Sequence, residues 1–163
     1  MMFGFSALYH RVNWKPKVLG LMRRLDHSSI FMMIAGTFTP ICLLVLPMAT
    51  GKNLLIIIWV IAGLGILQSI IFTNMPRLLR ASFYLGAGYL AIPYMSVMSS
   101  FMGYTNFALT VAGGTIYSVG AISYGFKFPD ISPEYFGFHE FFHLLVCIAA
   151  ILHFIVIYSI VGS

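Results

Sequence analysis

Apolar runs of about 20 residues, separated by short polar loops, constrain the fold of this chain more than any other feature. A helix of about 20 residues spans the bilayer core, because each residue adds about 1.5 Å to a layer about 30 Å thick. Only 8% of the 163 residues are charged, whereas a soluble domain has about 25%. The chain is therefore predicted to be an integral membrane protein, an all-α polytopic bundle of transmembrane helices.

The runs fit a single transmembrane domain over residues 1–163, with about five full helices after an N-terminal half helix. As a helix, the first run would be only about 18 Å long, which is less than the thickness of the bilayer core. Glycine pairs at 63 and 65 and at 113 and 114 are expected to let helices approach closely. The predicted helices span residues 1–12 (partial), 26–47, 54–73, 81–101, 107–124 and 136–158.

Nine cations flank the apolar runs, and their distribution predicts the topology. Lys52 stands alone on one side. The other eight fall in loops or at helix ends on the opposite side, including a loop predicted over residues 74–80: Arg11, Lys15, Lys17, Arg23, Arg24, Arg77, Arg80 and Lys127. The positive-inside rule makes this side cytoplasmic and leaves the C-terminus outside the cell (inner or plasma) membrane. Because these cations serve topology, we expect membrane lipids and no nucleic acid as partners.

Two histidines four positions apart, His139 and His143, open the last apolar run. Positions i and i+4 share a helix face, so both imidazoles can bind one metal ion. Catalytic zinc sites use three protein ligands, and the third must come from upstream. The chain has no carboxylate after Glu140, and His153 lies about 15 Å further along the helix. His10 is the best candidate for the third ligand.

The pattern from His139 to His143 also matches the zinc-protease motif, in which the glutamate is a general base. The extended motif is absent, since Val146 and Ala149 replace its glycine and third histidine. Glu140 also suits a helix cap, because a carboxylate is favoured at the positive end of the helix dipole. We favour the cap, and an intramembrane protease stays an alternative.

Ser6 and Asp26 are expected at the same level of the membrane as these histidines. Ser6 shares a helix face with His10, although a serine bonding to its own helix is common in membranes. Asp26 is predicted at the start of its helix, where it either serves the site or pairs with Arg23 or Arg24.

Two other histidines are not expected to bind the metal. His27 follows Asp26 but points about 100° away around a helix, so it is expected either to support the site from behind the ligands or to lie at a helix interface. His153, deep in the last run, is expected to form a hydrogen bond between helices.

Several segments together carry a resemblance to a known family. They are Ser6-Ala7-Leu8-Tyr9-His10, Leu25-Asp26-His27-Ser28-Ser29-Ile30, Ile34-Ala35-Gly36-Thr37-Phe38-Thr39-Pro40, His139-Glu140-Phe141-Phe142-His143 and His153-Phe154. In this order they resemble the bacterial hemolysin III family, which is grouped with the progestin and adipoQ receptors and resembles the alkaline ceramidases. The resemblance covers essentially the whole chain.

The resemblance implies a seven-helix bundle with zinc near the cytoplasmic face. It implies that His10, His139 and His143 bind Zn²⁺, that Asp26 holds or deprotonates the zinc-bound water, and that Ser6 hydrogen-bonds nearby. The family's first helix and half of its second have no counterpart in this sequence. We therefore expect a second copy of the chain, or another partner, to cover the exposed face.

Three functions are compatible with these residues. The leading hypothesis is a zinc-dependent hydrolase acting on lipid amide or ester bonds, because a carboxylate and three imidazoles are expected beside lipid. The first alternative is a membrane-perturbing, pore-forming hemolysin that causes cytolysis. The second is a receptor-like regulator of membrane lipid state in which zinc is structural. The sequence does not decide between an enzyme and a non-enzyme.

Overall fold

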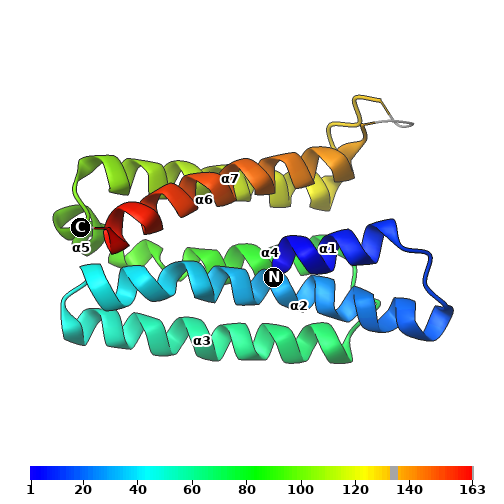
Figure 1. The fold of residues 1–163 in the computed structure, drawn as a ribbon, viewed down its shortest axis with the longest axis horizontal. Helices are drawn as coiled ribbons and strands as arrows, with labels where there is room; N and C mark the ends of the chain where they lie inside the picture. Colours follow the sequence, from blue (N-terminus) through cyan, green and yellow to red (C-terminus); the bar gives the residue numbers. More distant parts are fainter. Residues whose placement is uncertain (133–135, 163) are drawn as a thin grey trace.

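The computed structural model describes residues 1–132 and 136–162 as a bundle of helices joined by short turns (Figure 1). The elements are α1 (Met2–Arg11), α2 (Pro16–Pro40), a π-helical turn η1 (Ile41–Val45), α3 (Met48–Ile71), α4 (Arg77–Tyr89), a 3₁₀ turn η2 (Ile92–Tyr94), α5 (Met95–Phe101), α6 (Tyr104–Phe126) and α7 (Phe138–Val161). Among the described residues, four helical segments are long and apolar enough to cross a membrane: α2 with η1, α3, α6 and α7. The prediction of an all-α membrane bundle is confirmed.

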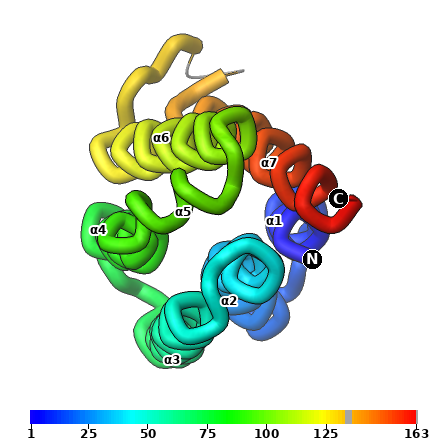
Figure 2. The backbone as a smooth tube through the Cα atoms, turned by 90° about the vertical axis from the view of Figure 1, so that its left-hand side faces the viewer, coloured from blue at the N-terminus to red at the C-terminus, as the bar shows by residue number. Residues whose placement is uncertain are grey.

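Two helix pairs form opposite walls of the bundle when it is viewed end-on (Figure 2). α2 packs against α3, and α6 packs against α7. α4 contacts α6, α2 and α3 and closes one side. The short α1 packs on α2 and lies between α2 and α7 on the other side. This arrangement brings the beginning of the chain next to its last helix.

α2 begins at Pro16, ten residues before the predicted start at residue 26. Proline is favoured in the first turn of a helix, because the amide it lacks has no partner there. The basic residues that follow extend their charged ends towards water while their stems cover the helix, so they do not end it. Asp26 consequently lies about 15 Å along α2, not at its start.

The helix predicted over residues 81–101 is interrupted in the structure. α4 ends at Tyr89, and Pro93 lies in the 3₁₀ turn η2 before α5 begins. Proline has no amide hydrogen and its ring clashes with the preceding turn, which explains the break. α4 also begins earlier, at Arg77, so Arg80 is a helical residue that is only 4% exposed. Its prediction as a loop residue was wrong.

The two ends of the bundle differ in charge. At one end, which we call the basic end, α1, α3 and α6 finish and α2, α4 and α7 begin (Figure 1). The eight cations predicted to share a side are found towards this end, and Lys52 stands near the start of α3 at the other. The main hydrophobic core extends from the middle of the bundle to the opposite end, the apolar end, and its most buried members include Phe31, Ile41, Leu54, Ile58, Met98 and Val156.

Candidate metal centre

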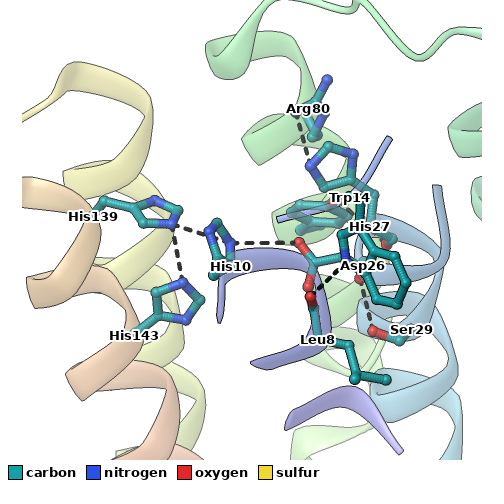
Figure 3. Close-up of polar contacts among 10 residues, drawn as sticks. Leu8, His10, Trp14, Asp26, His27, Ser29, Arg80, His139 and His143 are labelled. Atoms are coloured by element: carbon teal, nitrogen blue, oxygen red, sulfur yellow. Dashed lines mark hydrogen bonds and ion pairs between the residues drawn. The ribbon is translucent and has the colours of Figure 1, made fainter. Parts of the chain in front are cut away.

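Three histidines from the two ends of the chain converge at the basic end (Figure 3). His139 and His143 lie on the first turns of α7, and His10 lies one residue before the end of α1. The Nε2 atom of His139 is 3.4 Å from that of His10 and 3.1 Å from that of His143. One ligand atom from each side chain falls within 4.8 Å of the other two. The three residues predicted as metal ligands therefore meet at one point.

The donor set and its spacing fit zinc. Zinc–imidazole bonds of about 2.0–2.1 Å in a tetrahedral arrangement place neighbouring nitrogens about 3.3 Å apart. Two of the three spacings, 3.1 and 3.4 Å, lie close to this value, and all three ligand atoms lie within 4.8 Å of one another. Three protein ligands would leave the fourth position for water or substrate, as in catalytic rather than structural zinc sites. Imidazole is also a ligand for copper, iron and nickel, so the donor set alone does not select zinc.

Local hydrogen bonds fix the two segments that carry these histidines. The Glu140 carboxylate accepts a hydrogen bond from the backbone amide of Gly137 at 3.0 Å, which caps the start of α7. The interpretation of Glu140 as a cap is thus confirmed. The indole of Trp14 donates to the backbone carbonyl of Leu8 at 2.8 Å and ties the end of α1 to the turn before α2.

Asp26 lies beside the metal centre without joining the ligand set. Its Oδ2 atom is 3.9 Å from the Nε2 atom of His10 (Figure 3), and the residue is 8% exposed. The side chain of Ser6 contacts the same carboxyl group. The carboxylate therefore lies beside His10, just outside hydrogen-bonding distance of its ring nitrogen.

His27, Arg80 and Tyr84 form a second polar cluster, which the sequence analysis did not assign to the site. Arg80 donates to the Nε2 atom of His27 at 3.1 Å, and the hydroxyl of Tyr84 donates to the backbone carbonyl of His27 at 3.5 Å. Because a guanidinium can only donate, His27 Nε2 must be unprotonated. His27 is an interface residue, as predicted. Arg80 could have been found in the sequence as an ionisable residue next to an apolar segment, which often marks a functional site. Its position beside a predicted loop instead made it look like a surface cation.

His153 lies away from the metal centre, as its spacing predicted. Its Nε2 atom donates to the backbone carbonyl of Thr110 at 3.1 Å, which joins α7 to α6. The ring also packs against Gly113, where any larger side chain would collide with it. This histidine is a hydrogen-bonding residue between helices and not a metal ligand.

A cavity of about 810 Å³ runs from the metal centre into the bundle. Its polar mouth includes the three histidines, Ser6 and Asp26. Further inside it is lined mainly by apolar side chains, and Met98 and His153 mark its inner part. The metal centre thus opens onto a long, largely apolar chamber inside the membrane-crossing helices.

Comparison with known proteins places this chain in a family. The model for the "Haemolysin-III related" family matches residues 1–154. The chain is 40% identical over 124 residues to "Hemolysin-3" of Bacillus cereus and 37% identical over 122 residues to "Hemolysin-3 homolog" of Bacillus subtilis (strain 168). Each match covers 75% of this chain and, respectively, 55% and 57% of the relative.

A more distant similarity reaches animal proteins. The chain is 26% identical over 162 residues to "Monocyte to macrophage differentiation factor" of Homo sapiens, covering 97% of this chain and 65% of that protein. The chain thus spans a little over half to about two thirds of the length of the curated relatives it matches. No solved structure matches.

Proposed function

This multi-pass membrane chain belongs to the haemolysin-III related family, and we propose that it is a zinc-dependent hydrolase that acts on amide or ester bonds of membrane lipids. The observation that carries the proposal is the position of three converging imidazoles and one carboxylate at the mouth of a large apolar cavity. An apolar chamber within a membrane bundle suits a lipid chain, and the polar mouth would then hold the bond to be cleaved.

Each residue of the site has a distinct role in this proposal. His10, His139 and His143 hold the zinc ion. When bound, zinc supplies Lewis-acid catalysis, which polarises a carbonyl group and makes water a better nucleophile at neutral pH. Asp26, 3.9 Å from His10, takes the proton of the attacking water as general base. Ser6 orients the carboxyl group of Asp26, and the apolar helices exclude bulk water from the chamber.

The proposed orientation follows from the charges of the basic end. Cytoplasmic loops of membrane proteins carry an excess of lysine and arginine. Eight of the nine cations lie towards the basic end. The proposed site therefore faces the cytoplasmic side of the cell membrane, and the C-terminus lies outside.

Zinc content and lipid hydrolysis together test the proposal. Detergent-purified protein should contain about one zinc per chain by elemental analysis, and His10→Ala should lose it. Asp26→Asn should keep the zinc but lose hydrolysis of a long-chain N-acyl amide or ester by at least about 100-fold, the usual range for a general base. Unchanged zinc content in His10→Ala would contradict the proposal. So would a rate of lipid hydrolysis in Asp26→Asn equal to that of the wild type.

The names of the two bacterial relatives favour a second candidate, a protein that perturbs membranes. Dye-filled vesicles separate the two functions. If the protein is lytic, the His139→Ala variant should release the dye as fast as the wild type, because lysis needs no metal. Hydrolysis-dependent damage should disappear in that variant.

A further inference from the structure

The cavity carries an excess of positive charge at its mouth. Among its lining residues that the structure describes, the charged ones are Arg23, Arg77, Arg80 and Asp26. Three guanidinium groups thus face one carboxylate, which leaves two positive charges unbalanced even before a metal is counted. Charges inside a membrane protein are costly unless they are paired, and unpaired ones mark ligand sites.

Arg80 is the most deeply placed of these cations. It is 4% exposed, and its hydrogen-bond partners are neutral: the Nε2 atom of His27 and the backbone carbonyls of Thr73 and Met75, at 3.1–3.2 Å. Asp26 forms an ion pair within 4 Å with His10 but with none of the arginines of the described chain. The bonds to backbone hold the guanidinium in place, and the more distant Asp26 carboxylate acts on its charge only through space.

The other two arginines line the same cavity as Arg80. Arg77 lies three residues before it on α4, hence on the same helix face. The Arg77 guanidinium rests over the ring of Phe138, 5.2 Å from its centre, beside the metal-binding end of α7. Arg23 of α2 donates to the side chain of Asn74 at 3.5 Å, in the same turn whose carbonyls bind Arg80. Arg23 and Arg80 therefore meet at the turn between α3 and α4, and Arg77 lies between this turn and the start of α7.

We propose that the cavity binds a single-chain lipid phosphate monoester, with its phosphate held by Arg23, Arg77 and Arg80 and its chain among the apolar lining residues. A phosphate monoester carries a charge of about −1.5 to −2 at pH 7, which matches the two positive charges that the three arginines leave after Asp26, counted without a metal. A carboxylate would neutralise only half of it. Guanidinium groups also bind phosphate oxygens in pairs of parallel hydrogen bonds.

The size of the cavity favours one chain. Pockets of about 300–1,000 Å³ hold one small ligand, and about 810 Å³ lies within this range. The inference names a ligand class for the site of the proposed function. It rests on that proposal because it takes this cavity as the lipid-binding site. Binding of the phosphate by the arginines does not require the metal, so the two proposals fail separately.

Native mass spectrometry of the full chain in detergent tests the inference, because one spectrum reports both bound zinc and bound lipid. The probes are hexadecyl phosphate, hexadecanoate, hexadecanol and inorganic phosphate. We expect hexadecyl phosphate to bind one molecule per chain, at least about tenfold more tightly than hexadecanoate or hexadecanol. Each of Arg23→Gln and Arg77→Gln should weaken it about tenfold, as expected for a charge-assisted hydrogen bond, without changing zinc content.

Arg24→Gln is the matched control. Arg24 neighbours Arg23 on α2 but does not line the cavity, and its Nε atom donates to Thr73. It should leave binding unchanged, whereas an equal loss in Arg24→Gln and Arg23→Gln would reduce the effect to general surface charge and overturn the inference. Binding of hexadecanoate or hexadecanol as tightly as hexadecyl phosphate, or more tightly, would also overturn it. Binding of inorganic phosphate without binding of hexadecyl phosphate would overturn it too. Absence of zinc with selective binding of hexadecyl phosphate would refute only the proposed hydrolase.

Discussion

The basic end and the apolar end of the bundle use the same residue types for different purposes. Near the basic end, His139 and His143 are partly exposed and meet other imidazoles beside an open cavity. Deeper in the same helix, His153 is buried, bonded to a backbone carbonyl and packed against a glycine. The difference shows that the chemistry of a histidine in this bundle depends on what faces it rather than on its helix. One end provides ligands, and the other provides stability.

The largest expected effect comes from comparing two histidines of α7. His143→Ala should lower zinc affinity at least about 100-fold, since the loss of a direct ligand exceeds that of a supporting residue. His153→Ala should keep the zinc but lower the free energy of unfolding by about 1–3 kcal/mol, because it removes a buried hydrogen bond and leaves a void. Elemental analysis and thermal unfolding in detergent measure both. Zinc loss in His153→Ala would break the distinction between the two ends.

Two glycines of α3 provide a sharper test of packing. A methyl group on Gly65 would collide with the ring of Phe31, which is 2% exposed, whereas one on Gly63 would meet open space. Gly65→Ala should therefore destabilise the protein by about 1–3 kcal/mol. Gly63→Ala should be neutral or stabilising by up to about 1 kcal/mol, because alanine favours a helix. Denaturation in mixed micelles measures both, and equal effects would contradict the packing described for α2 and α3.

A smaller effect is expected from the cap of α7. Glu140→Ala removes the acceptor for the Gly137 amide and should cost about 1 kcal/mol of stability. Glu140→Gln keeps an acceptor oxygen and should cost less. Neither should lower the rate of lipid hydrolysis per bound zinc. A rate that falls more than tenfold in both variants would give Glu140 the catalytic role that the zinc-protease motif suggests.

The smallest expected effect concerns the attachment of α1. Trp14→Phe keeps an aromatic side chain, although a smaller one, but removes the hydrogen bond to the Leu8 carbonyl, a loss of about 0.5–1.5 kcal/mol. Because α1 carries His10, zinc affinity should fall by a few fold while α7 stays unchanged. Zinc titration with a competing chelator measures this change. Unchanged affinity would mean that packing on α2 alone positions α1.

The candidate site was predictable because its residues follow local rules. His139 and His143 need only a helix between them to face the same way. No suitable ligand follows them in the sequence, which pointed to His10 as the third. The structure brings these three together and places Asp26 and Ser6 beside them. Their roles in binding zinc and in catalysis stay predictions for the experiments above.

Other features were not predictable because they depend on tertiary contacts. Gly63 and Gly65 look equivalent in sequence, yet only Gly65 faces another helix. Arg80 looks like a loop cation, but the start of α4 turns it into the bundle, where three neutral acceptors are available. Helix starts were also misplaced, since α2 already includes the basic residues near the membrane surface, whereas hydropathy alone starts this helix ten residues too late.

The meeting of His10 with His139 joins two residues 129 positions apart in the chain. A metal ion held by both would act as a cross-link that closes nearly the whole sequence into one loop. Closing a loop of about 100 residues removes chain entropy worth about 4–5 kcal/mol from an unfolded ensemble, by analogy with a disulfide. The metal would therefore stabilise the fold as a cross-link in addition to any role in catalysis. Its removal would release the first helix from the last.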